Sequence, residues 1–284
     1  MELRDGITAL IYTFNNEKEI RNVLESISKS KINQLIVADG GSNDQTRQIS
    51  RIFTKYVIKS EKGFSKQHQA ARKYIKYKFI LNIESDHFYP ENFAENLKKE
   101  LLISEFYGIS GSLKPKYLGN YFERGVSAFY KIHHLEKGQK ELIAGPCMYF
   151  TDKYLKYVNY AEFNGYSADT YKAEIEKSNG LKVGLGHTFA YQVQRVNFKT
   201  CLYKYYNYGL GDYDFYSFFS EKWSFIRKIK SVTHVFIQYC IEYPLISIKQ
   251  NLWQYIPFFW MIALVRYYGW ISRIISNRPI KDLS

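Results

Sequence analysis

The chain has 284 residues, 46% of them hydrophobic, which is enough for one large domain or a domain with an appendage and excludes a disordered protein. Lys and Arg total 40 against 27 acids, and the net charge of +13 favours an anionic partner: nucleic acid, phospholipid headgroups or a phosphorylated substrate. The three cysteines are far apart, so neither a zinc site nor a disulfide framework is indicated and a reducing, cytosolic setting is expected.

Strands and helices alternate over the first hundred residues. A short apolar run at 7–12 is too brief for a signal sequence and is expected to be the first strand. The next segment has apolar residues at i, i+3, i+4 and i+7, which predicts a helix over 20–27. Further strands are expected at 34–38, 55–58 and 79–83, with helices starting near Gln45 and spanning 65–74. The alternation predicts an α/β fold with a parallel, helix-covered sheet.

Polar clusters follow three of these strands, at 13–17, 39–44 and 84–87. In parallel sheets, ligands bind beyond the carboxyl ends of the strands. The glycine motifs that bind dinucleotides and nucleoside triphosphates are missing, and acids stand in their place. Glu84 and Asp86, two residues apart, can hold a hard divalent cation, although an ordinary polar loop explains them equally well. Lys66 and Arg72 lie on the intervening helix near the same edge.

Four segments in a fixed order carry a resemblance to a known family. They are ALIYTFNNEKEIRNVLESI, QLIVADGGSNDQTRQI, FILNIESDHFYPENF and GYSADTYKAEIEKSNGLKVG. Together they resemble the family 2 glycosyltransferases with the GT-A fold. The resemblance implies a Rossmann-like, mixed and mainly parallel sheet with flanking helices. It also implies a catalytic domain over 1–212, with a nucleotide-sugar half at 1–90 and an acceptor half at 91–212.

The resemblance assigns the donor nucleotide to the first two clusters. It implies that Thr13 and Glu17 border the base and ribose, that Asp39 contacts the base, and that Lys66 and Arg72 touch the diphosphate. Turn and capping chemistry explains the first three residues without a ligand, and the two basic residues can equally be solvated surface charges. The donor implied is a nucleotide diphosphate sugar, with UDP as the expected nucleotide.

The resemblance also implies a site for Mn²⁺ or Mg²⁺. Asp86 matches the last acid of the family's Asp-x-Asp element, and Glu84 takes the place of the first. Many family members add a His on a strand shortly before a basic helix that ends in Tyr-Gly, here YKYYNYGLG. Counting back places Gln192 at that position, so His187 is the nearest candidate for a third ligand.

Asp169 is the candidate catalytic base. It lies in SADTY, where the family's Glu-Asp pair opens a helix below the acceptor site, with Ala168 in place of the Glu. The resemblance implies an inverting transfer in which this carboxylate takes the proton of the attacking hydroxyl group of a saccharide or lipid-linked saccharide. A plain helix N-cap is the alternative explanation.

The segment 213–284 is expected to be an amphipathic helical region at a membrane surface. EKWSFIRKIKSVTHVFIQYC mixes aromatic and apolar residues with Lys and Arg, as in a helix at a lipid headgroup boundary. The apolar run 256–265 is shorter than the roughly 20 residues that cross a bilayer. We therefore expect a cytoplasmic protein, peripheral on the inner face of the cell membrane and bound to anionic lipid. A helical hairpin packed on the catalytic domain and a re-entrant insertion remain alternatives.

Two other classes of function fit parts of the sequence. A nucleic-acid-binding protein would explain the charge and the abundant aromatic residues, but the clusters at the strand ends are acidic, so no nucleic-acid partner is expected. A non-catalytic, membrane-docked partner subunit with a degenerate transferase fold would explain Glu84, Ala168 and Gln192. Loss of donor hydrolysis on Asp86→Ala would exclude that subunit.

Overall fold

The computed structural model describes residues 2–160, 163, 167–193 and 195–276. The chain divides into two compact units. The first takes in 1–116, 136–164 and 169–194, and the second 117–135, 165–168 and 195–284. Each unit has a hydrophobic core of its own.

A mixed β-sheet with the strand order β3-β2-β1-β4-β8-β6-β9-β5 forms the first unit, and β7 pairs with β9. The strands β1 to β4 run parallel, whereas β8 pairs antiparallel with β4 and β6. The strand bounds are β1 (Arg4–Thr13), β2 (Gln34–Asp39), β3 (Tyr56–Lys59), β4 (Tyr77–Ile83), β5 (His87–Phe88), β6 (Gly108–Pro115), β7 (Gly138–Lys140), β8 (Cys147–Phe150) and β9 (Val183–Gln192).

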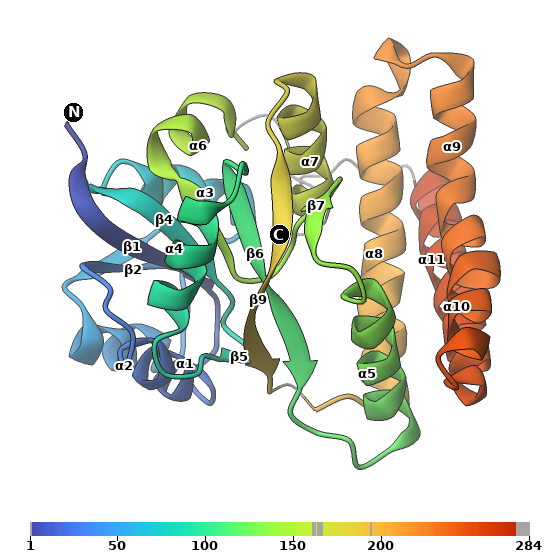
Figure 1. Cartoon of the computed structure of the whole chain (residues 1–284), viewed down its shortest axis with the longest axis horizontal. Coiled ribbons are helices and arrows are strands. Elements are labelled where there is room, and N and C mark those ends of the chain that lie inside the picture. Colours follow the sequence, from blue (N-terminus) through green and yellow to red (C-terminus); the bar gives the residue numbers. More distant parts are fainter. Residues whose placement is uncertain (1, 161–162, 164–166, 194, 277–284) are drawn as a thin grey trace. The chain divides into compact units, whose positions relative to one another are not determined.

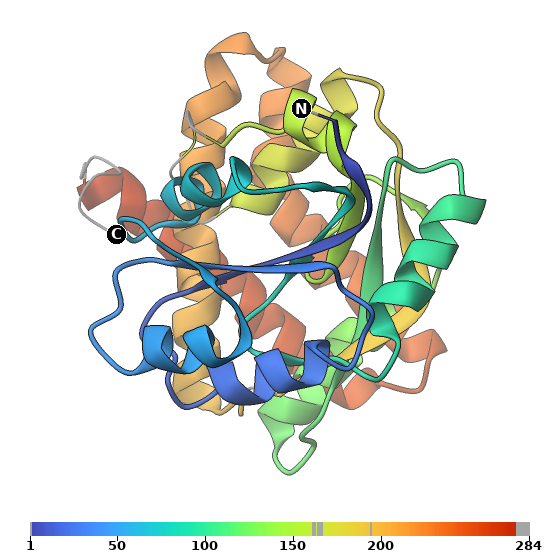
Figure 2. The same ribbon diagram turned by 90° about the vertical axis from the view of Figure 1, so that its left-hand side faces the viewer.

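Helices cover both faces of the parallel part of this sheet. The pair α1 and α2 lies on one face, and α3 and α6 lie on the other (Figures 1 and 2). The bounds are α1 (Ile20–Ile27), α2 (Thr46–Phe53), α3 (Phe64–Arg72), α4 (Phe93–Ile103), α6 (Thr151–Tyr157) and α7 (Ala168–Ser178). The expected α/β architecture, a mixed sheet with flanking helices, is confirmed.

The register of β1 with its neighbours positions the site. Thr13 pairs with Asp39 of β2, and Ile11 pairs with Ile83 of β4. The carboxyl ends of the three strands therefore lie side by side, and Glu84, the residue after β4, comes next to Tyr12. The strands are buried on both faces, as expected where helices cover both sides of a parallel sheet.

The second unit is helical. Its elements are α5 (Tyr121–His133), α8 (Phe198–Phe219), the short 3₁₀ turn η1 (Ser220–Lys222), α9 (Phe225–Phe236), the π-helical segment η2 (Ile237–Glu242), α10 (Tyr243–Lys249), the 3₁₀ turn η3 (Trp253–Tyr255) and α11 (Ile256–Ser276). The domain boundary expected after residue 212 falls within α8, and α5 belongs to this unit. No helix among the residues that the structure describes combines the length and the apolar character needed to cross a bilayer.

Two glycines allow α8 and α11 to pack closely. A Cβ atom on Gly209 would lie 2.0 Å from the carbonyl oxygen of Arg266, and one on Gly269 would lie 2.3 Å from the carbonyl oxygen of Tyr206. The expected helix end at Tyr208-Gly209 is wrong, because α8 continues to Phe219. The glycine serves the helix contact here instead of terminating the helix.

Candidate active site

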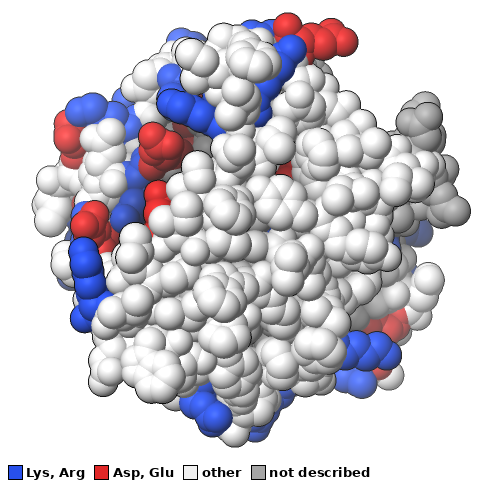
Figure 3. Space-filling view, turned by 90° about the vertical axis from the view of Figure 1, so that its right-hand side faces the viewer, with Lys and Arg blue, Asp and Glu red and all other residues white. Residues whose placement is uncertain are grey.

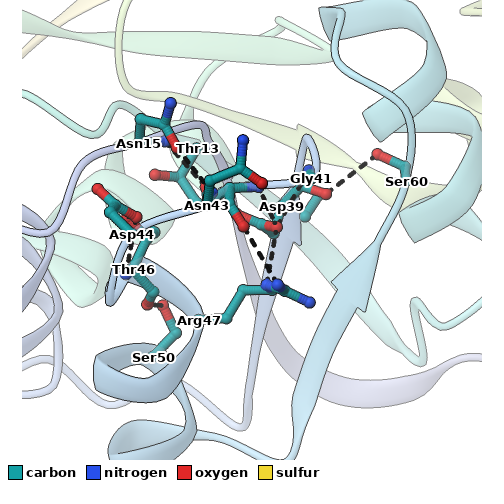
Figure 4. A network of polar contacts seen from close by, with 12 residues as sticks. Thr13, Asn15, Asp39, Gly41, Asn43, Asp44, Thr46, Arg47, Ser50 and Ser60 are labelled. Carbon is teal, nitrogen blue, oxygen red and sulfur yellow. Dashed lines mark hydrogen bonds and ion pairs between the residues drawn. The ribbon is translucent and has the colours of Figure 1, made fainter.

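The loops after β1 and β2 are joined by a network of hydrogen bonds. Asp39 is fully buried, and its carboxylate accepts bonds from the backbone N–H groups of Gly41 and Ser42 at 3.1 and 2.9 Å and from the Ser42 hydroxyl at 2.5 Å. The guanidinium of Arg47 lies 3.6 Å from the same carboxylate (Figure 4). Ser42 in turn accepts a bond from the N–H of Asn15 at 2.8 Å. Asp39 thus shapes its own turn and ties it to the loop after β1.

The other predicted nucleotide residues occupy different environments. Thr13 is buried, and its hydroxyl has no hydrogen-bond partner among the described residues. Glu17 is exposed and bonds the loop of α2, accepting from the N–H of Gln45 at 3.0 Å. Lys66 is exposed and forms an ion pair with Glu61, whereas Arg72 donates to the carbonyl oxygen of Leu155 at 2.6 Å. The contact of these two residues with the donor diphosphate stays a prediction.

A cavity of about 140 Å³ opens beside the carboxyl end of β4. Its wall combines two acids, a lysine and several aromatic rings, among them Tyr12, Phe64, Glu84, Tyr160, Asp169 and Lys172. Glu84 reaches it from the loop after β4, and Asp169 from the first turn of α7. The predicted base and one predicted metal ligand therefore share one cavity. Asp39 and Asp86 do not line it.

The charge at Asp169 is balanced by Lys172, one helical turn further along α7. Desolvation raises the pKa of the Asp169 carboxyl above its ordinary value, and Lys172 acts in the opposite direction. Lys172 is buried and donates to the Tyr149 hydroxyl at 2.5 Å and to the carbonyl oxygen of Ile143 at 2.9 Å. Its ammonium lies 3.9 Å from the carboxylate of Glu176, which is also buried. Burial opposes the charge on Lys172, but the neighbouring acids, led by Glu176, raise its pKa overall.

Tyr12 lines the same cavity as the two acids. Its hydroxyl is buried and has no hydrogen-bond partner among the described residues. Burial raises the pKa of this phenol, and the nearby Tyr154, Glu84 and Asp169 raise it further, so the hydroxyl remains a donor at all ordinary pH values. A buried donor without a partner is costly, which makes Tyr12 a candidate contact for an oxygen atom of a bound substrate. From the sequence, Tyr12 was expected only to be part of the first strand, although it is the last residue before the polar cluster.

Three side chains near the end of β4 can hold a cation. Ligand atoms of Glu84, Asp86 and His87 all lie within 4.8 Å of one another, and Nδ1 of His87 is 3.6 Å from Asp86. His87 is buried on β5 and pairs with Gln192 of β9. The family resemblance placed a histidine at position 192 of β9. The imidazole comes instead from His87 on the neighbouring strand β5. The sequence contained a signal for this histidine, because His87 directly follows Asp86.

The structure does not bring His187 to this group. It is exposed on β9, and its backbone N–H donates to Glu100 at 2.7 Å. Gln192, which pairs with His87, is five residues further along the strand, or roughly 16 Å at 3.3 Å per residue. A shifted loop would not close such a gap, because both residues belong to one continuous strand.

Comparison with known proteins identifies the family of the chain. The family model "Glycosyl transferase family 2" matches residues 8–173, which is more than half of the chain. An uncharacterized protein of Methanocaldococcus jannaschii is 31% identical over 134 residues, covering 43% of this chain and 57% of that relative. The chain therefore matches only a little more than half the length of this relative.

Several solved structures share the fold. A mannosyltransferase from Pyrobaculum calidifontis, in complex with GDP-Man and Mn²⁺, superposes with a TM-score of 0.66 at 12% identity, covering 97% of this chain and 88% of that chain. Glucosyl-3-phosphoglycerate synthase from Mycobacterium tuberculosis gives a TM-score of 0.56 at 17% identity, with 75% and 79% covered. TarS from S. aureus gives 0.51 at 15% identity, with 74% and 65% covered. The extent of the family match, supported by these folds, shows that the chain belongs to glycosyl transferase family 2.

Proposed function

We propose that this protein transfers a sugar from a nucleotide diphosphate donor, UDP-linked in the first instance, to a hydroxyl group of a saccharide or lipid-linked saccharide. The observation that carries the proposal is the cavity at the carboxyl end of β4, which Glu84 and Asp169 both line. Family membership supports the reaction class. The donor nucleotide would lie against the joined loops 13–17 and 39–44, where the fully bonded Asp39 acts by fixing the turn.

The residues after β4 fit a divalent cation. Glu84 and Asp86 offer carboxylate oxygens and His87 offers an imidazole nitrogen, and these atoms lie within 4.8 Å of one another. This donor set suits Mn²⁺ or Mg²⁺, with water and donor phosphate as the remaining ligands. When bound, such a cation offsets the negative charge that builds on the leaving diphosphate. Metal dependence is thus part of the proposal.

Asp169 is the proposed base. Its carboxylate takes the proton of the acceptor hydroxyl, the freed oxygen bonds to the anomeric carbon, and the bond from that carbon to the diphosphate breaks, which inverts the configuration. Burial raises the pKa of Asp169, which makes its carboxylate a stronger base than that of an ordinary aspartate, and Lys172 acts in the opposite direction by favouring the charged form. The unpartnered hydroxyl of Tyr12 would donate to a sugar oxygen in the same cavity.

The acceptor is proposed to be carried at a membrane surface, with the protein peripheral on the inner face of the cell membrane. The support comes from the second unit, whose helices α9 to α11 expose many large apolar side chains. A lipid-linked saccharide would present its hydroxyl at the same surface. A soluble saccharide acceptor remains compatible with the cavity itself.

A nucleotide screen with and without Mn²⁺ tests the proposal. UDP- and GDP-sugars are added to the full chain, and thermal stability and release of nucleoside diphosphate are measured. We expect a Mn²⁺-dependent response to one nucleotide class, lost in Asp86→Ala and retained in Asp152→Ala, a control at an exposed acid of α6. Binding of Mn²⁺ alone, followed by its electron paramagnetic resonance signal, should weaken in His87→Gln as well.

Asp169→Asn separates binding from catalysis. We expect turnover to fall by about 10²–10⁴-fold while nucleotide binding persists, because a general base contributes about that factor. An unchanged rate in this variant would contradict the assignment of the base. Nucleotide binding without any turnover by the unmutated chain would instead favour the non-catalytic partner subunit.

A further inference from the structure

Helix α11 has its charges on the inside. Its only charged residues are Arg266 and Arg273. Arg266 donates to both carboxylate oxygens of Asp212 on α8 at 2.9 and 2.7 Å, and Arg273 donates to Asp214 at 2.8 Å. Both arginines are therefore paired within the unit, and neither presents a free charge to the outside.

The opposite side of α11 is apolar and exposed. Residues spaced three or four apart share one side of a helix, and those on the outer side of α11 are Trp260, Leu264, Tyr268, Ile271 and Ile275. Leu264, for example, is 71% exposed. A helix in a water-soluble protein normally has the reverse arrangement, with its apolar stripe buried and its charges outside.

The neighbouring helices extend this apolar surface. Along η2 and α10, the exposed residues at similar spacing are Ile237, Ile241, Leu245 and Ile248, and Trp253 follows in η3. The view in Figure 3 is nearly free of charged side chains across its centre, and Lys and Arg, together with some Asp and Glu, lie toward its margin. We call these exposed residues of α11, η2, α10 and η3 the apolar face.

Basic residues accompany the apolar face. Segment 220–249 carries five Lys and Arg side chains that are not buried, against two acids, Glu221 and Glu242. The five are Lys222, Arg227, Lys228, Lys230 and Lys249. Cations beside an exposed apolar surface complement an anionic headgroup layer, in which the apolar side chains reach the acyl chains and the cationic groups stay with phosphate.

We propose that the apolar face seats in the headgroup and acyl boundary of an anionic lipid membrane. This inference rests on the membrane location in the proposed function and deepens it, because it names the residues that contact the lipid, but it does not depend on the proposed transfer reaction. The exposed Trp253, Trp260 and Tyr268 suit that boundary, where amphipathic rings concentrate. Since no described helix can span a bilayer, the helices lie in the plane of the interface.

A lipid layer explains the face better than a protein partner does. Protein interfaces of the non-obligate kind contain polar groups and about one hydrogen bond per 100–200 Å². The outer side of α11 offers no charged group and, among Trp260, Leu264, Tyr268, Ile271 and Ile275, only the polar tips of two aromatic residues. Apolar side chains need no hydrogen-bond partners among acyl chains. Burying the apolar side chains of α11 there therefore carries no penalty for unsatisfied polar groups.

Vesicle flotation of the full chain tests the proposal. Phosphatidylcholine vesicles with and without phosphatidylglycerol serve as the probe. We expect flotation with the anionic vesicles, and a loss of at least about tenfold in partitioning for Leu264→Glu and for Ile248→Glu, because each places a charge in the apolar face. Ile103→Glu is the matched control, since Ile103 is 87% exposed but lies on α4 in the first unit.

Two further measurements make the outcome unambiguous. The variant Lys228→Glu/Lys230→Glu should lower binding to anionic vesicles by about tenfold or more and reduce its salt dependence, since each basic residue near the surface contributes about fivefold. Emission of Trp253 and Trp260 should shift to shorter wavelength when vesicles bind. Circular dichroism verifies the fold of each variant.

Three results would overturn the inference. They are no flotation of the unmutated chain, equal flotation of Leu264→Glu, and a vesicle-independent dimer that Leu264→Glu dissolves, which would assign the face to a second copy of the chain. Nucleotide binding measured without vesicles should be unchanged in Leu264→Glu. The membrane inference and the proposed reaction can thus fail separately.

Discussion

Lys172→Met is expected to destabilise the first unit strongly. The ammonium of Lys172 is buried, donates two hydrogen bonds, to Tyr149 and Ile143, and lies 3.9 Å from the buried carboxylate of Glu176. Methionine has nearly the same volume but leaves the Glu176 charge without its partner. Removing one member of a buried pair costs about 3–5 kcal/mol of the free energy of unfolding.

A double-mutant cycle supplies the test. Adding Glu176→Gln to Lys172→Met removes the isolated charge, and the amide oxygen of the new side chain can still accept the bond that Tyr107 donates to Glu176 at 2.6 Å in the unmutated chain. We expect the double variant to recover about 1–3 kcal/mol relative to Lys172→Met alone. Unfolding by urea is followed by circular dichroism, because all four tryptophans, Trp223, Trp253, Trp260 and Trp270, belong to the second unit.

The pH dependence of the free energy of unfolding provides an independent test of this buried pair. Burial raises the pKa of Glu176, and Lys172 lowers it, so the pKa should rise further in Lys172→Met. A carboxyl whose pKa is raised in the folded state destabilises that state as the pH rises through this pKa. The loss in the free energy of unfolding caused by Lys172→Met should therefore become smaller as the pH falls. Exposed Lys177 on the same helix is the control, and Lys177→Met should cost less than about 0.5 kcal/mol. A loss below about 1 kcal/mol in Lys172→Met, or no recovery in the double variant, would refute the reasoning.

Other measurements follow from the same geometry. In the pH profile of kcat/KM, the acid limb should lie above the ordinary aspartate range, because desolvation raises the pKa of Asp169, and Lys172→Gln should move that limb further toward high pH. Tyr12→Phe should raise the KM for a sugar substrate or lower kcat without changing Mn²⁺ affinity, which titration with Mn²⁺ alone would verify. Gly209→Ala should cost about 1–3 kcal/mol, seen as an earlier transition in tryptophan emission, since its Cβ would meet the Arg266 carbonyl at 2.0 Å. A Gly209→Ala protein as stable as the unmutated chain would disprove the close approach of α8 and α11.

Local sequence signals were sufficient for the first four strands of the fold. The strands expected at 7–12, 34–38, 55–58 and 79–83 correspond to β1 to β4, with ends that differ by three residues at most. For β1, β2 and β4 such runs are reliable because a strand buried on both faces is mostly apolar and ends where polar residues begin. The same rule placed Glu84 at a strand end, and the family motif placed Asp169 at a helix start, where the structure brings both to one cavity.

The pairing between strands far apart in the chain could not be predicted from local sequence patterns. His87 joins Glu84 and Asp86 in the possible cation site, yet its selection over His187 depends on the pairing of β5 with β9. Likewise, Lys172 and Glu176 stand four residues apart on a helix, a spacing that usually marks an exposed ion pair. Their burial follows from the packing of α7 against the segments that carry Tyr107 and Tyr149, which no local pattern encodes.

The sequence by itself determined the α/β class, the family and the acidic residues at the strand ends, because these depend on periodicity and on motifs within single segments. Only the tertiary structure decided which histidine approaches the acids and which side of α11 faces outward. In α11, Arg266 and Arg273 interrupt an apolar helix and would be expected to face water, but Asp212 and Asp214 of α8 draw them inside. The direction of a helix face is set by its partners, and those partners are known only after the chain has folded.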